Sequence, residues 1–188
     1  MSYYSDLELE NLGFKYIGKN VKISKQACIY GHNNIKIGSN SRIDDLCIIS
    51  GKKEIGRNVH ITPQCLLAGG TEGLELQDFT TLAYGVKVFT QSDDYSGRTL
   101  TNSTIPKKYK NEFKKRIIIK KYSIIGANST IMPGIIIEEG TSVGANSLML
   151  KDSLCWSIYA GVPAIKIKGR SKKMLLLIDE YLKNENEF

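Results

Sequence analysis

Histidine is the first residue type to consider for chemistry in this sequence, because an imidazole titrates near neutral pH and often acts as a general base. The 188-residue chain contains only two histidines, His32 and His60. His60 lies among the alternating polar residues Asn58, Thr62 and Gln64, whereas His32 belongs to a Gly-His-Asn-Asn run that is typical of a solvated turn. His60 is therefore the better candidate base; the alternative is an exposed polar residue on a β-sheet wall.

A second group of candidates lies in the polar segment QSDDYSGR. Asp93 and Asp94 are adjacent there, and Tyr95 and Arg98 follow them. Neighbouring carboxylates can raise each other's pKa, which would make one of them a base, but the same residues also favour a plain turn. We predict that at least one of these four residues contacts substrate, and we include Tyr84 as a further substrate-binding candidate.

Positive charge is concentrated in residues 107–121 and 166–173, and the formal net charge is +7. Such clusters suit nucleic acid or a phosphate-rich small molecule. No nucleic-acid motif accompanies them, so we expect no nucleic-acid partner. The N-terminus has no signal-peptide pattern, and no segment approaches the ~18 apolar residues of a membrane span. We therefore expect a cytoplasmic protein without stable membrane insertion.

The scaffold that must position these residues is visible as a six-residue repeat. Its spaced positions after Ile117 are apolar: Ile119, Ile125, Ile131, Ile137, Val143 and Met149. This period fits neither a helix nor a single strand, and it is typical of a parallel β-helix in which three units make one eighteen-residue coil. Gly126 and Gly144, eighteen residues apart, should stack. Cys47 and Cys65 should stack likewise, as small buried residues without a redox or metal role.

The repeat also divides the chain into segments. It runs through residues 15–90 and 117–151 and survives two short insertions, so we predict one all-β domain over residues 1–188. Ser5 and Glu8 form a capping box for a short helix over residues 5–12, with leucines on one side. The polar, basic residues 91–116 break the period and form an arm. Residues 152–188 form a C-terminal extension that ends in a helix.

The run IIGANSTIMPGIIIEEGTSVGANSLMLKD, followed by YAGVPAIKIKGR, resembles the hexapeptide-repeat acyltransferases. The resemblance covers roughly residues 15–170. It is strongest to the galactoside, maltose and xenobiotic acetyltransferase branch and to the O-acetyltransferases of surface-polysaccharide loci. It implies a left-handed parallel β-helix, a homotrimer, and acetyl-CoA as co-substrate, with no metal.

The same resemblance implies a groove for coenzyme A between two β-helix prisms, that is, between two subunits. In the relatives the pantetheine arm bonds to backbone groups at coil corners, and small residues there let the backbone approach the ligand. Lysines and an arginine nearby are candidates for phosphate contacts. The implied cofactor-binding residues are Gly126, Ala127, Gly144, Ala145, Lys151, Ala160, Gly161, Pro163, Lys166, Lys168 and Arg170.

One departure from the family concerns the base. The galactoside branch carries its catalytic histidine in the loop after the strand that matches residues 85–90, where this chain has QSDDY. Three alternatives stay open. His60 on the preceding coil could take the role, or Asp93 or Asp94 could, or no protein base is needed, which suits an amine nucleophile.

We therefore predict an acetyl-CoA-dependent acetyltransferase that acts on a sugar or glycan hydroxyl in surface-polysaccharide synthesis. The alternative within enzymes is N-acetylation of a nucleotide-linked amino sugar, which the missing loop histidine favours. A metal hydratase on this coil would need three histidines and is excluded, because the chain has two. A non-catalytic β-helix scaffold is the alternative of another class.

Overall fold

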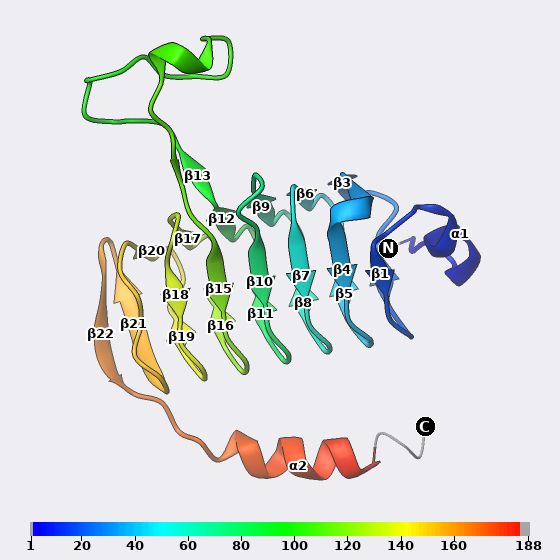
Figure 1. Ribbon diagram of the computed structural model, residues 1–188. Helices are drawn as coiled ribbons and strands as arrows, with labels where there is room; N and C mark the ends of the chain where they lie inside the picture. Colours follow the sequence, from blue (N-terminus) through cyan, green and yellow to red (C-terminus); the bar gives the residue numbers. More distant parts are fainter. Residues whose placement is uncertain (1, 185–188) are drawn as a thin grey trace.

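The computed structural model describes residues 2–184, and its main feature is a parallel β-helix (Figure 1). The chain winds through three sheets in turn, so that each coil contributes one short strand to each sheet. Among the described residues there are six complete coils. The predicted all-β fold is confirmed, and residues 1 and 185–188 of the predicted domain lie outside the described part.

The three sheets are built from strands of two to six residues. Sheet one contains β1 (Tyr16–Ile17), β4 (Ile35–Ile37), β7 (Lys53–Ile55), β10 (Leu74–Leu76), β15 (Ile117–Ile119) and β18 (Ile136–Ile137). Sheet two contains β2 (Lys22–Ile23), β5 (Arg42–Ile43), β8 (His60–Ile61), β11 (Thr81–Leu82), β16 (Ile124–Ile125), β19 (Ser142–Val143), β21 (Ser157–Gly161) and β22 (Ala164–Gly169). Sheet three contains β3 (Cys28–Tyr30), β6 (Ile48–Ser50), β9 (Leu66–Ala68), β12 (Lys87–Phe89), β17 (Thr130–Ile131) and β20 (Leu148–Met149).

The register of the strands follows the six-residue repeat. Ile125 pairs with Val143, eighteen residues further on, as the repeat predicts. The spaced aliphatic residues fill the interior, and this column of sheet two is 2% exposed or less: Ile23, Ile43, Ile61, Leu82, Ile125 and Val143. Because each coil buries its aliphatics against the coils on either side, the core is continuous along the axis.

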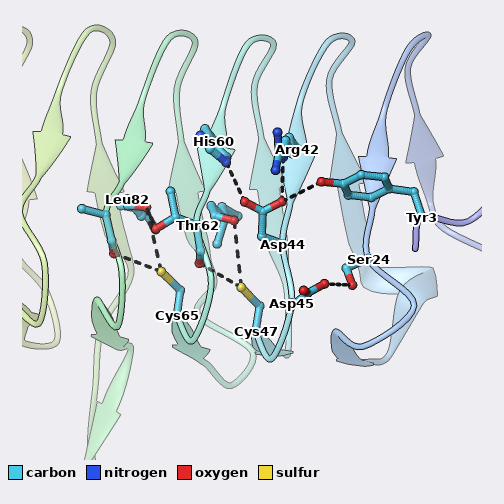
Figure 2. Close-up of polar contacts among 12 residues, drawn as sticks. Tyr3, Ser24, Arg42, Asp44, Asp45, Cys47, His60, Thr62, Cys65 and Leu82 are labelled. Carbon is cyan, nitrogen blue, oxygen red and sulfur yellow. Dashed lines mark hydrogen bonds and ion pairs between the residues drawn. The ribbon is translucent and has the colours of Figure 1, made fainter. Parts of the chain in front are cut away.

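The predicted cysteine stack is confirmed. Cys47 and Cys65 are fully buried on adjacent coils, and both are free thiols. Each Sγ atom lies close to a carbonyl oxygen on the next coil along the chain: Cys47 Sγ is 3.1 Å from that of Thr62 (Figure 2), and Cys65 Sγ is 3.3 Å from that of Ala83. They fill space in the interior as small apolar residues with a weak hydrogen-bond donor.

Departures from the repeat gather at one edge of the prism, where sheet three passes into sheet one. We call it the third edge; it consists of residues 31–34, 51–52, 69–73, 90–116 and 132–135. Both short insertions lie there, the first as the 3₁₀ turn η1 (His32–Asn34), and so does the arm. The second edge, where sheet two passes into sheet three, consists of residues 24–27, 44–47, 62–65, 83–86, 126–129 and 144–147 and carries no insertion.

Different elements cover the two ends of the prism. Helix α1 (Asp6–Asn11) begins at the capping box, in which the Ser5 amide donates to Glu8 at 2.8 Å, and Leu9 joins the core. Leu7, expected on the same apolar side, is 70% exposed. At the other end β21 and β22 form an antiparallel hairpin, which the repeat did not predict.

Helix α2 (Met174–Asn184) runs from this hairpin back beneath the coils (Figure 1). Ile178 is its buried residue, and the Tyr181 ring meets Phe79 at 6.0 Å while its hydroxyl bonds to Asn58. Helix α2 therefore packs against the wall of the β-helix. Neither described helix is long and apolar enough to cross a membrane.

Candidate active site

The arm, residues 91–116, leaves the third edge through a two-stranded root. Strand β13 (Gln91–Ser92) pairs antiparallel with β14 (Phe113–Lys114), and the amide of Lys115 donates to the carbonyl of Thr90 at 3.0 Å. Beyond the root the arm extends away from the coil and contains the 3₁₀ turn η2 (Lys107–Tyr109) (Figure 1). The root fixes where the candidates of the QSDDYSGR segment begin.

A pocket of about 370 Å³ lies at this root. Phe89 and Met132 come from the coil, and the arm supplies polar groups. The lining residues are Phe89, Gln91, Ser92, Asp93, Tyr95, Ser103, Glu112 and Met132. The pocket thus combines an apolar wall with carboxylates, which is the composition of a site for a small ligand that is partly apolar and partly charged.

The two carboxylates that line this pocket have different surroundings. Glu112 accepts ion pairs from Lys110 and Lys114, both at 2.7 Å, and these hydrogen bonds lower the pKa of its carboxyl to about 2. Asp93 Oδ2 accepts only the backbone amide of Asn102 among the described residues, at 3.2 Å. Glu112 is therefore engaged by its lysine neighbours, whereas the Asp93 carboxylate has more hydrogen-bonding capacity left for a ligand amine.

The structure gives Asp94 a different task from that of its neighbour. Its carboxylate accepts the Ser96 amide at 2.8 Å and the Thr99 hydroxyl at 3.1 Å, and these hydrogen bonds lower the pKa of the Asp94 carboxyl. This arrangement is an Asx turn, the alternative that the sequence left open. Tyr95 lines the pocket yet is 91% exposed, and Arg98 lies on the exposed surface of the arm.

His60 lies on the outer surface of sheet two, as the register predicts, and points toward Asp44 (Figure 2). Its Nε2 lies 2.9 Å from Asp44 Oδ2, and Asp44 Oδ1 receives Arg42 Nε at 2.6 Å and the Tyr3 hydroxyl at 3.2 Å. Burial opposes ionisation of Asp44, but the hydrogen bonds from Arg42 and His60 prevail and lower the pKa of its carboxyl.

An ionised Asp44 accepts a hydrogen bond from the Nε2–H group of His60, and in that tautomer the Nδ1 atom carries the free lone pair. The arrangement is that of a histidine oriented by a carboxylate, which is compatible with a base and equally with a surface polar cluster. His60 does not line the pocket at the arm root. Its role as a base stays a prediction.

The small residues expected to approach coenzyme A stack at the end of the second edge. The amide of Gly126 donates to Val143, and that of Gly144 donates to Tyr159, so that Gly126, Gly144 and Ala160 form one column. A side chain at Gly126 would meet the Ala145 nitrogen at 2.5 Å. The coil's own packing therefore requires this glycine, whether or not a ligand lies beside it.

The remaining members of the implied cofactor set lie around that column. Ala127 and Ala145 follow the two glycines at the corner, and Gly161 and Pro163 lie at the turn of the β21–β22 hairpin, where the Gly161 amide donates to the Ser147 hydroxyl. Tyr84 lies at the same edge and is 60% exposed.

The basic candidates divide into exposed and engaged groups. Lys151, Lys166 and Lys168 are exposed, the latter two on β22. Arg170 is partly buried, and its Nη1 donates to the carbonyls of Tyr122 at 2.7 Å and Gly140 at 3.0 Å, while burial lowers the pKa of its guanidinium. Arg170 thus ties the C-terminal segment to the coils, and its contact with a phosphate stays a prediction.

The structure therefore sorts the sequence candidates onto two edges of one prism. Asp93 and Tyr95 lie at the third edge, whereas Tyr84 and the glycine column lie at the second. Sequence reasoning missed Phe89, Met132 and Glu112 as pocket residues. Phe89 and Met132 each directly follow an inward-facing aliphatic residue, so the repeat predicts that both point outward. An outward apolar side chain next to the arm could have marked them as pocket residues.

Comparison with known proteins agrees with the fold. Residues 116–151 match the family described as bacterial transferase hexapeptide (six repeats). The dTDP-4-amino-4,6-dideoxy-D-glucose acyltransferase of Escherichia coli is 36% identical over 180 residues, which are 94% of this chain and 93% of that protein. The chain belongs to the hexapeptide-repeat acyltransferases, and the resemblance seen in its sequence is confirmed. The left-handed sense of the coil is the one expected of this family.

Solved structures narrow the similarity further. AntD, an N-acyltransferase from Bacillus cereus in complex with dTDP and 3-hydroxybutyryl-CoA, is 46% identical, with a TM-score of 0.97 over 98% of each chain. A variant of AntD in complex with dTDP-4-amino-4,6-dideoxyglucose and coenzyme A is 47% identical, with a TM-score of 0.96 over 97% of this chain and 98% of that one.

A maltose O-acetyltransferase from Clostridium difficile 630 is only 19% identical, with a TM-score of 0.60 over 88% of this chain and 75% of that one, and shares the fold. The protein is an acyltransferase, and the expectation that it acetylates a hydroxyl is not confirmed, because the two most similar proteins named above are amino-sugar and N-acyltransferases. In residues 2–184 no group of three or more His, Cys, Asp or Glu side chains is placed to hold a metal.

Proposed function

We propose that this protein is an acyl-CoA-dependent N-acyltransferase that acts on the 4-amino group of a dTDP-4-amino-4,6-dideoxy sugar. The observation that carries the proposal is the 46% identity to AntD over 98% of both chains, because AntD was solved with dTDP and an acyl-CoA. The name of the Escherichia coli relative specifies the same kind of sugar.

The chemistry of an amine acceptor suits the residues of the arm root. A neutral amine attacks a thioester carbonyl without prior deprotonation, whereas a hydroxyl needs a base at the moment of attack. The C–N bond forms, the C–S bond breaks, and one proton leaves the nitrogen while the thiolate of coenzyme A departs. A carboxylate at the acceptor suffices to orient the amine and receive that proton, and no histidine lines the pocket.

We assign the pocket at the arm root to the sugar. Its wall of Phe89 and Met132 fits the 6-methyl group of a 6-deoxy sugar. A sugar with a 6-hydroxymethyl group would place its hydroxyl against this apolar wall without a hydrogen-bond partner. Asp93 is the residue for the amino group, because its carboxylate lines the same pocket and its side chain is committed to one backbone amide among the described residues. Asp94 shapes the turn that presents it.

We assign coenzyme A to the end of the second edge, as the family implies. The column of Gly126, Gly144 and Ala160 gives a path without bulky side chains, and Lys166 and Lys168 are exposed on β22 next to it. Clustered ammonium groups bind phosphates in a manner that salt weakens. The donor here is an acyl-CoA, and both acetyl-CoA and 3-hydroxybutyryl-CoA are candidates.

Since acceptor and donor are assigned to different edges, the complete site requires two copies of the chain. Tyr95, 91% exposed, and Tyr84, 60% exposed, are the aromatic side chains that a neighbouring copy would cover. We therefore propose the homotrimer expected of the family, with each site between two subunits. Light scattering should give about three times the 21.0 kDa of one chain, and a stable monomer would contradict the shared site.

The test of function is a matrix of acceptors and donors. The purified protein is mixed with acetyl-CoA or 3-hydroxybutyryl-CoA, and with dTDP-4-amino-4,6-dideoxyglucose, its 6-hydroxy counterpart, or a plain glycoside, while thiol release is followed. We expect turnover with the amino sugar, a kcat/KM lower by about tenfold or more for the 6-hydroxy counterpart, and none with the glycoside. Faster turnover of the glycoside would overturn the proposal and restore O-acetylation.

A further inference from the structure

Lys53 is the largest side chain that the coil buries completely. It is the first residue of β7, and its side chain points inward. In sheet one it pairs with Ile35 on the preceding coil and Leu74 on the following coil, and Leu74 pairs in turn with Ile117. Its neighbours in that column are aliphatic, so a lysine replaces a residue of the hydrophobic core. Its Nζ donates to the carbonyl oxygens of Ser50 and, at 3.3 Å, of Lys52.

A buried amine is costly, and this one has no carboxylate partner among the described residues. Burial alone lowers the pKa of Lys53 to about 8. An aliphatic residue would avoid this cost, because replacing a buried charge by an apolar residue of similar volume is often neutral or stabilising. The position therefore calls for a role that lies outside simple core packing.

The two carbonyls belong to the turn of residues 50–52 at the third edge, on which the diglycine corner Gly69-Gly70 stacks. Gly51 has φ +78°, and a Cβ on it would lie 2.0 Å from the Gly69 oxygen. A Cβ on Gly69 would lie 2.6 Å from Lys53 Nζ and 2.9 Å from Thr90 Oγ1. Gly69 thus fits between the buried amine and the Thr90 hydroxyl.

The contacts continue from the diglycine corner into the arm. The Gly70 amide donates to Thr90 Oγ1 at 3.1 Å, and Thr90, which is buried, is the last residue of the β-helix before the arm. Its carbonyl accepts the Lys115 amide, which joins the two ends of the arm. A Cβ on Gly70 would lie 2.9 Å from Oε1 of Gln91, a residue of the pocket.

We propose that Lys53 is a positioning residue for the acceptor: its amine fixes the turn beneath the diglycine corner, and that corner sets the position of the arm root. The side chain acts through Thr90 and Gln91 and does not touch substrate. The kinetic part of this inference rests on the proposed function, because it takes the pocket at the arm root to hold the acceptor.

The test compares Lys53→Met with Leu74→Met, a change on the neighbouring rung of the same column that removes no amine. Hydrogen exchange measured by mass spectrometry reports on the arm without any substrate. We expect exchange in residues 91–116 to be faster by about tenfold in Lys53→Met, with acceptor KM raised by about tenfold and acyl-CoA KM within about twofold of the parent. Leu74→Met should leave all three unchanged.

Arm exchange in Lys53→Met equal to that of Leu74→Met would overturn the inference, whatever the enzyme acylates. If the parent fails to acylate the amino sugar, the proposed function fails, and the exchange comparison still decides the role of Lys53. Should Lys53→Met not fold, Thr90→Val carries the test, because it removes the hydroxyl that Gly70 uses and keeps the shape of the side chain. Unchanged arm exchange in Thr90→Val would then contradict the proposal.

Discussion

Lys53 makes a measurable prediction about stability as well as about the arm. The ordinary pKa of its amine is 10.5, and burial lowers it to about 8 in the folded chain. Below pH 8 both the folded and the unfolded chain hold the proton, so the full cost of burying the charge is present. Between pH 8 and 10.5 the folded chain loses the proton first, the unfolded chain binds more protons, and stability rises with pH.

The size of the effect follows from the displacement of the pKa. A change from 10.5 to about 8 corresponds to roughly 3 kcal/mol of free energy of unfolding, of which about 2 kcal/mol should appear between pH 7 and 9.5. Lys53→Met lacks this group. The difference in free energy of unfolding between parent and variant should therefore change by about 2 kcal/mol over that range, in favour of the parent at high pH.

The assay is urea unfolding at a series of pH values and at one protein concentration, because the stability of an oligomer depends on concentration. All other titrating groups are shared by parent and variant and cancel in the difference. Leu74→Met is the matched control, and its difference from the parent should stay constant with pH. Parallel stability curves for the parent and Lys53→Met would refute the view that a protonated amine is buried there.

The remaining predictions concern the assigned sites. Asp93→Asn should lower kcat by about 10²-fold, since the carboxylate proposed to receive the proton is lost. Asp94→Asn should mainly raise the acceptor KM, because the turn becomes looser. Steady-state kinetics separate the two effects, and equal effects of the two variants would contradict this division of roles. His60→Ala should stay within about threefold of the parent kcat on an amino sugar, because a neutral amine needs no base; a loss above about 10²-fold would restore His60 as the base. Gly126→Ala should destabilise the fold by about 1–3 kcal/mol, because its Cβ would lie 2.5 Å from a backbone atom. Gly144→Ala should cost less, because its Cβ would lie 3.1 Å from the Ala160 side chain. If thermal unfolding ranks the two variants in the reverse order, the packing argument is refuted.

Much of the fold could be predicted because the repeat is a direct consequence of coil geometry. A residue that must point inward every six positions leaves a period that survives insertions, and the Ile125–Val143 register follows from counting. The capping box at Ser5 and the Cys47–Cys65 stack are equally local, since each depends on spacing alone. The arm was visible as the place where the period stops.

What the sequence did not reveal depends on contacts between distant segments. Lys53 lies two positions before the spaced aliphatic Ile55, so its inward direction was readable, but only the structure shows the carbonyls and the diglycine corner that receive its amine. The β21–β22 hairpin was missed because its exposed Ile165 and Ile167 alternate with lysines, a pattern that the six-residue count does not include.

The chemistry of the acceptor was the least predictable part. The missing loop histidine pointed toward an amine, whereas the resemblance to the O-acetyltransferases of surface-polysaccharide loci pointed toward a hydroxyl. The pocket at the arm root supports the proposed amine acceptor, because it places Asp93 beside an apolar wall of Phe89 and Met132. This combination cannot be seen in the sequence, where residues 89, 93 and 132 are not adjacent.

The gathering of both insertions and the arm at the third edge has a consequence for how such proteins diverge. Segments at that edge can be lengthened, shortened or exchanged while every strand keeps its register, because the period resumes at Ile117 as if nothing had intervened. The second edge differs, because backbone hydrogen bonds join each of its four-residue corners to the next, and an insertion there would break this stacking. The β-helix is therefore a constant scaffold whose third edge accepts segments of different length and sequence. Replacing residues 91–116 by the matching segment of a homologue should transfer its acceptor preference, while the acyl donor stays the same.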